Sequence, residues 1–180
     1  MRRLLHSAAL LVGVWALLAG CGGSDSSSGT SADDWASGYC GDATTWVTSL
    51  DTARTSVKTG TAPQEAAQSV TDETNSFIES INGLGTPDTP NGSTSEATAK
   101  SLAATLSGRV ARISAAVETN NPDVSVAQAT AIVQQQVAAS LTDIKTTTAK
   151  LAADDPELGT AMDASSDCTE LDSALAKASA

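Results

Sequence analysis

The chain has 180 residues, of which 21 are acidic and 10 basic, and its formal net charge at pH 7 is −11. A surface this acidic repels phosphates, so no nucleic-acid partner is expected. The only histidine is His6, so the sequence after it excludes Ser-His-Asp and Cys-His catalysis and histidine-ligated zinc. We therefore expect no enzymatic activity, no catalytic residue, no metal and no cofactor.

The first twenty residues have the composition of a secretory signal peptide. Arg2 and Arg3 form a basic start, and Leu4–Leu18 is apolar apart from one histidine and one serine. The uninterrupted apolar part covers residues 8–19, which is too short to span a hydrocarbon layer of about 30 Å. We predict that residues 1–20 are a leader that is removed, rather than an uncleaved membrane span.

The leader ends in Leu18-Ala19-Gly20-Cys21, which resembles the bacterial lipobox. In lipoproteins with this box, the cysteine thiol takes a diacylglyceryl group, the leader is cut before the cysteine, and the new amino group is often acylated with a fatty acid such as palmitate. The resemblance implies that Cys21 is lipidated and anchors the protein at the extracytoplasmic face of the cell membrane. Two or three acyl chains hold a protein there, whereas one chain binds only marginally. An ordinary secretory signal with a chance cysteine is the alternative.

Removal of the leader leaves 160 of the 180 residues, enough for one domain with a real core. Eight basic and 21 acidic side chains remain, a net charge of −13. Residues 21–32 are rich in glycine and serine and nearly free of apolar side chains, so we expect a flexible tether. The domain is then expected over residues 33–180.

From residue 33 onward, apolar residues recur every three or four positions, which is the periodicity of an amphipathic helix. The first stripe comprises Trp35, Tyr39, Ala43, Trp46, Leu50, Ala53 and Val57, with Gly60 as its stop. The second begins near Pro63 and comprises Ala66, Val70, Thr74, Phe77, Ile81 and Leu84. Residues 86–92 contain two prolines, an aspartate, an asparagine and a glycine, so a loop is expected there.

Three further helical stripes follow this loop. Ser93 and Glu96 have the spacing of a capping box for a third helix, and Ser125 and Gln128 have it for a fourth. Asp155 suits the cap of a fifth helix, because a proline and another acid follow it. The inward positions expected in that fifth helix are Leu158, Met162, Ser165, Cys168, Leu171 and Leu175.

No segment alternates as a β-strand does, and the connections between stripes are short. We predict an all-α fold, an antiparallel up-and-down bundle of four or five helices. Cys40 and Cys168 are an even pair in a compartment where disulfides persist, so we predict a disulfide between them. This bond would fasten the last helix to the flank of the first and close the bundle. A two-cysteine metal or redox site is the alternative, but the pair lacks CxxC spacing.

Several positions near the two ends of the domain form a recognisable set: Trp35, Tyr39-Cys40, Trp46 and Cys168-Thr169-Glu170-Leu171. This set resembles the small helical lipoproteins of actinobacteria. The resemblance supports the fold and the membrane address and implies no particular activity.

Trp35 and Tyr39 are the candidate binding patch, because aromatic side chains are scarce in this chain. The alternative is that both are core residues at helical spacing. Asp163, Asp167 and Glu170 share one helical face that could hold a hard cation, although such a face is more often solvated surface.

The sequence favours a membrane-anchored cell-envelope lipoprotein that acts as a non-enzymatic binding or scaffolding module, with an envelope protein as its candidate partner. The alternative is a carrier that holds a small apolar or cationic ligand within the helical bundle. An internal void above about 300 Å³ would favour the carrier. A filled core with an exposed apolar stripe would favour the partner module.

Overall fold

The computed structural model describes residues 29–59, 62–117 and 125–179. Within these ranges the chain is helical, and its one β-type contact is an isolated bridge between Thr30 and Pro87. The helices are α1 (Ala32–Lys58), α2 (Pro63–Gly83), α3 (Gly92–Val117), α4 (Val126–Asp154), α5 (Pro156–Ala164) and α6 (Ser166–Ala178). The predicted all-α class is confirmed.

Helix α1 begins within one residue of the predicted position because Ser31 caps it. The Ser31 hydroxyl oxygen accepts the backbone N–H of Asp34 at 3.1 Å. Asp33 and Asp34 also place negative charge at the positive end of the helix dipole. Local capping therefore sets where α1 starts.

The residues just before α1 are held against the α2–α3 loop. The backbone N–H of Thr30 donates to the carbonyl of Thr86 at 3.0 Å, and the N–H of Asp88 donates to the carbonyl of Thr30 at 2.8 Å. Residues 29–32, which the sequence assigns to the flexible tether, thus include backbone groups with fixed partners. The ordered domain begins a few residues earlier than expected.

Helix α3 begins at Gly92, one residue before the predicted cap, so Ser93 lies inside the helix. Glu96, the predicted second member of that capping box, instead accepts hydrogen bonds from Lys100 and Thr86. These two hydrogen bonds lower the pKa of Glu96, and the bond from Lys100 has the larger effect. The acid therefore links the helix to the preceding loop rather than capping the helix.

The predicted caps of the next two helices are confirmed. The Ser125 hydroxyl accepts from the backbone N–H of Gln128 at 3.3 Å, and the Gln128 side chain accepts from the N–H of Ser125 at 2.8 Å. Asp155 accepts from the backbone N–H of Leu158 at 3.3 Å, with Pro156 in the first turn of α5.

The prediction of four or five helices is wrong for the described residues, which form six. The expected fifth helix is broken at Ser165, whose backbone is extended (φ −78°, ψ 128°). Serine favours such breaks because its hydroxyl can form hydrogen bonds that compete with the helical hydrogen bonds of the backbone. Here the Ser165 hydroxyl lies 3.3 Å from that of Ser37 on α1. The break lets α6 change direction after α5.

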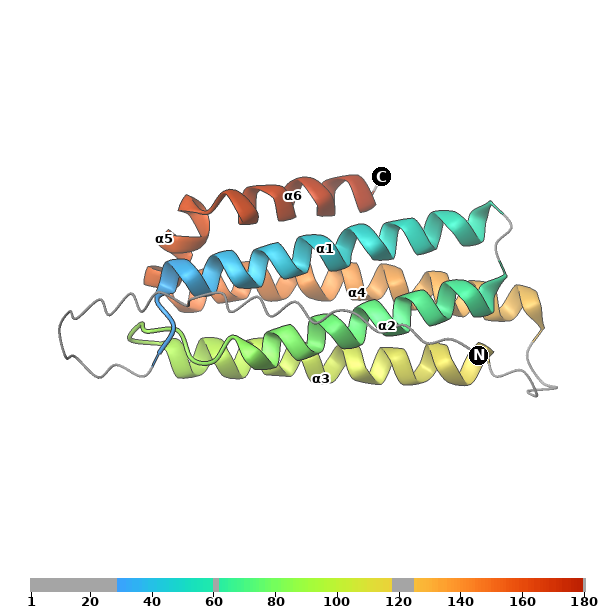
Figure 1. Ribbon diagram of the computed structural model, residues 1–180, viewed down its shortest axis with the longest axis horizontal. Helices are drawn as coiled ribbons and strands as arrows, with labels where there is room; N and C mark the ends of the chain where they lie inside the picture. The colour runs from blue at the N-terminus through green and yellow to red at the C-terminus, as the bar shows by residue number, and fades with distance from the viewer. Residues whose placement is uncertain (1–28, 60–61, 118–124, 180) are drawn as a thin grey trace, which may run out of the picture.

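The packing order follows the chain. Helix α1 packs against α2 and α6, α2 against α3, and α3 against α4. Figure 1 shows α1 to α4 side by side, with α5 at one end of the molecule and α6 beside α1. No helix in the described ranges has the length and apolarity needed to cross a membrane.

An aromatic cluster fills the core between α1 and α2. The rings of Trp35 and Tyr39 stack with centroids 5.3 Å apart, and those of Trp46 and Phe77 stack at 4.8 Å. The indole N–H of Trp46 donates to the Thr74 hydroxyl at 3.0 Å. This bond explains a polar residue in the apolar stripe of α2, since a buried indole N–H needs a partner.

Candidate functional site

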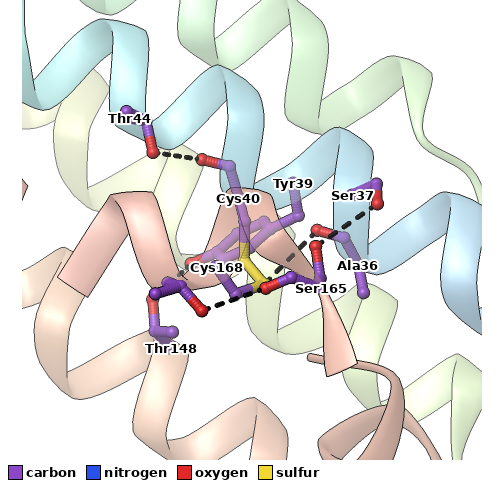
Figure 2. Close-up of a disulfide and its surroundings, with 9 residues drawn as sticks. Ala36, Ser37, Tyr39, Cys40, Thr44, Thr148, Ser165 and Cys168 are labelled. Carbon is purple, nitrogen blue, oxygen red and sulfur yellow. Dashed lines mark hydrogen bonds between the residues drawn. A yellow bond between two sulfur atoms is a disulfide. The ribbon is translucent and has the colours of Figure 1, made fainter. Parts of the chain in front are cut away.

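The disulfide joins Cys40 of α1 to Cys168 of α6, two residues separated by 128 positions whose Cα atoms lie 4.8 Å apart. Figure 2 shows the bond between the two helices. Cys40 is fully buried, and Cys168 keeps 9% of its surface exposed. The Cys168 sulfur also lies 3.7 Å from the Ala36 carbonyl oxygen, which is a packing contact because a disulfide sulfur has no proton to donate. The predicted pairing is present.

Trp35 and Tyr39, the candidate binding patch, have no exposed surface. The indole N–H of Trp35 donates to the carbonyl of Gly85 at 3.0 Å. The Tyr39 hydroxyl lies 3.3 Å from that of Thr148 on α4 (Figure 2). Burial raises the pKa of Tyr39 well above its usual value, and the hydrogen bond with Thr148 opposes this effect only in part. Both side chains therefore belong to the core, as the alternative interpretation from their helical spacing predicts, and they do not form an exposed binding patch.

The surface beside the disulfide is hollowed into a groove of about 360 Å³, lined by α4, α5 and α6, which we call the α4–α6 groove. It arises because α6 packs along α1 and touches α4 only lightly. Its apolar lining comprises Ala149 and Ala152 of α4, Met162 of α5, and Cys168 and Leu175 of α6. One sulfur of the disulfide thus belongs to its wall.

Charged side chains stand at the edge of the α4–α6 groove. Asp163 and Asp172 line it from α5 and α6, and Lys145 lines it from α4. All three are exposed, and none forms an ion pair within the described ranges. Lys145 also lines a neighbouring cavity of about 370 Å³ that includes Arg54. The groove therefore combines an apolar floor with two carboxylates that form no ion pair within the described ranges.

A second groove, of about 400 Å³, lies between α3 and α4 and is lined mainly by threonine and serine side chains. Its two charged residues already have partners. Asp143 accepts from Arg109 Nε at 2.6 Å, and Lys150 pairs with Asp154. This groove offers a ligand hydroxyl groups but no unpaired charge, so the α4–α6 groove is the stronger candidate.

The cavities described above are open to solvent, so they do not provide the internal void expected of a carrier. Val126, at 66%, is the one large apolar side chain that is exposed in the part of the chain that the structure describes. An apolar stripe on the described surface is therefore absent as well.

The three acids predicted to share one face are divided by the helix break. Asp163 is on α5 and lines the groove, whereas Asp167 and Glu170 are on α6. Asp167 lies close to α1, since a Cβ on Gly41 would be 4.0 Å from its Cγ. In the described ranges no three acidic, cysteine or histidine residues come together as metal ligands would.

Sequence reasoning missed Lys145, Asp172 and the groove itself. Helical periodicity shows which face of a helix turns inward, but it does not show how far apart two helices stand. One usable signal was present, because residues 151–176 contain seven acidic side chains and no lysine or arginine.

The leader (residues 1–20), Cys21 and the tether up to residue 28 lie outside the described residues. Comparison of the chain with protein-family models, with curated proteins and with solved structures finds no match. The case for a function therefore rests on the residues of this chain and on their arrangement.

Proposed function

We propose that the chain is a membrane-anchored cell-envelope lipoprotein that acts as a non-enzymatic binding or scaffolding module. The observation that carries the proposal is the basic and apolar leader followed by Leu18-Ala19-Gly20-Cys21. Lipid on Cys21 gives stable attachment to the extracytoplasmic face of the membrane when two or three acyl chains are present. Cleavage of the leader also removes His6, the only histidine.

The helical domain is the part that meets other molecules in this proposal. We infer that α1 to α4 form an antiparallel up-and-down bundle, which is supported by the packing of each helix on the next. The acidic body is repelled by anionic headgroups, so it stands away from the bilayer at the end of its tether. Its surface is then free to meet envelope proteins.

The α4–α6 groove supports binding as the activity of the domain. An apolar floor lets a partner bury carbon surface, and the carboxylates of Asp163 and Asp172 add selectivity by charge. A carrier of a small cationic or apolar ligand is the second candidate. The observation that bears on it is the volume of the open α4–α6 groove, about 360 Å³, so such a ligand would be held at the surface between α4 and α6 rather than inside the bundle.

Membrane attachment is tested by Cys21→Ser in the native host, followed by fractionation and a high-salt wash. We expect the wild-type chain in the membrane fraction and the variant in the soluble or secreted fraction, because a serine has no thiol to lipidate. Cys40→Ser is the matched control, since it removes a different cysteine and should leave attachment unchanged. Retention of the Cys21→Ser chain on washed membranes would refute the lipobox interpretation.

A further inference from the structure

From the end of α4 through α5 and most of α6 the charged side chains are acidic, and Lys177 in the last turn of α6 is the first basic residue after them. Residues 151–176 include seven acidic side chains and no lysine or arginine. Two of the seven have partners, because Asp155 is a buried hydrogen-bond acceptor and Asp154 pairs with Lys150. The other five form no ion pair in the described ranges: Glu157, Asp163, Asp167, Glu170 and Asp172.

Two of these unpaired carboxylates, Asp163 and Asp172, stand where apolar surface is also accessible, because both line the α4–α6 groove. Ala149 contributes exposed carbon surface to the same groove, and Met162 and Leu175, which are 4% and 5% exposed, lie behind it. Carboxylates at the edge of an apolar floor are complementary to an amphipathic cation. A lysine or arginine side chain is of this kind, since its methylene stem packs on apolar atoms while its charged head stays at a polar edge.

We propose that the α4–α6 groove docks a basic segment of a protein partner, whose arginine or lysine heads are held by Asp163 and Asp172. The proposal rests on the function proposed above and names the kind of partner. Arginine suits the site well because its guanidinium can hold a carboxylate through two hydrogen bonds. Without the leader the net charge is −13, which also steers a cationic segment toward this molecule. Lys145, on the α4 side of the groove, opposes the same occupant.

The test is isothermal titration of the full chain, held in micelles of an uncharged detergent. The probe is an acetylated and amidated hexapeptide of alternating alanine and arginine. We expect saturable binding that weakens as salt is added, because exposed charge pairs are screened. The double variant Asp163→Asn with Asp172→Asn should bind about fivefold more weakly, because it loses two exposed charge pairs.

The matched control is Glu65→Gln with Glu79→Gln on α2. Both glutamates are exposed and line none of the cavities described above, and their replacement changes the net charge by the same amount. This control should bind the peptide nearly as the wild type does. Equal weakening by the two double variants would overturn the proposal, because binding would then reflect net charge alone.

Two single variants separate shape from charge. Ala149→Leu fills the floor of the groove without a change in net charge, and it should abolish binding at peptide concentrations that saturate the wild type. Lys145→Gln removes the opposing charge and should tighten binding. The circular dichroism melt of each variant confirms that it is folded. Unchanged binding by folded Ala149→Leu would show that the peptide docks elsewhere.

Two other results would also overturn the proposal. One is no binding of the hexapeptide at low salt. The other is binding of argininamide as tightly as the hexapeptide, which would identify a small cation as the ligand. Neither result depends on membrane attachment, which the fractionation of Cys21→Ser tests separately. Failure of this inference is therefore distinguishable from failure of the lipoprotein proposal.

Discussion

Asp155 is the polar residue on which several parts of the fold converge. It is only 1% exposed, yet its carboxylate accepts the hydroxyls of Thr89 at 2.5 Å and Ser95 at 3.0 Å as well as the N–H of Leu158 at 3.3 Å. These donors come from the α2–α3 loop, α3 and α5. A buried carboxylate is tolerated when its lone pairs are filled in this way.

We expect Asp155→Ala to lower the free energy of unfolding by about 2–4 kcal/mol, because it removes a helix cap and leaves two hydroxyls without their acceptor. Asp154→Ala is the control, since it removes the neighbouring carboxylate, which is exposed and pairs only with Lys150. Its effect should stay within about 0.5 kcal/mol. Urea unfolding followed by circular dichroism measures both. Similar losses in the two variants would contradict the central role of Asp155.

Tyr39 makes the stability of the fold depend on pH under alkaline conditions. Because burial raises its pKa in the folded state, the folded protein holds the phenol proton more tightly than the unfolded chain does. The free energy of unfolding is therefore unaffected by the ionisation of this group below pH 10, the usual pKa of tyrosine, and it decreases as the pH rises beyond that value. Tyr39 is the only tyrosine, so tyrosinate absorbance reports on it alone.

We expect that absorbance to appear only as the helical circular dichroism signal is lost at high pH. Tyr39→Phe removes the ionisable group, so its unfolding midpoint should lie at a higher pH than that of the wild type. Titration near pH 10 in a chain that is still fully helical would show that Tyr39 is accessible to solvent.

At the scale of the helices, most boundaries could be predicted because they depend on neighbouring residues. Ser31 was not assigned as a cap, yet the stripe from Trp35 placed α1 correctly, and the capping box at Ser125 marked the start of α4. The break at Ser165 could not be predicted, because it accompanies packing against Ser37 on a distant helix. Short-range patterns carry no information about such a contact.

The candidate site was less predictable than the helices for the same reason. The pairing of Cys40 with Cys168 followed from their number and compartment alone. The burial of Trp35 and the opening beside Asp172 depend on how far each helix stands from its neighbours. A scarce residue type suggested a binding patch at Trp35, but large aromatic side chains contribute most to stability when they are buried.

At the scale of the whole molecule, the disulfide links the first helix to the last. Helix α6 packs along α1 and touches α4 only lightly. A helix of 13 residues is marginally stable without tertiary support. The bond between Cys40 and Cys168 therefore holds α6 in place and, with it, one wall of the α4–α6 groove.

Reduction should consequently destabilise the entire domain. The bond closes a loop of 128 residues, for which the chain-entropy model gives about 4–5 kcal/mol. For a domain of this size that corresponds to a fall in melting temperature of roughly 10 °C or more. The double variant Cys40→Ala with Cys168→Ala should melt at a temperature near that of the reduced wild type, and reductant should not affect it further. If the oxidised and reduced wild-type chains melt together, the bond does not stabilise the fold, and the groove wall depends on packing alone.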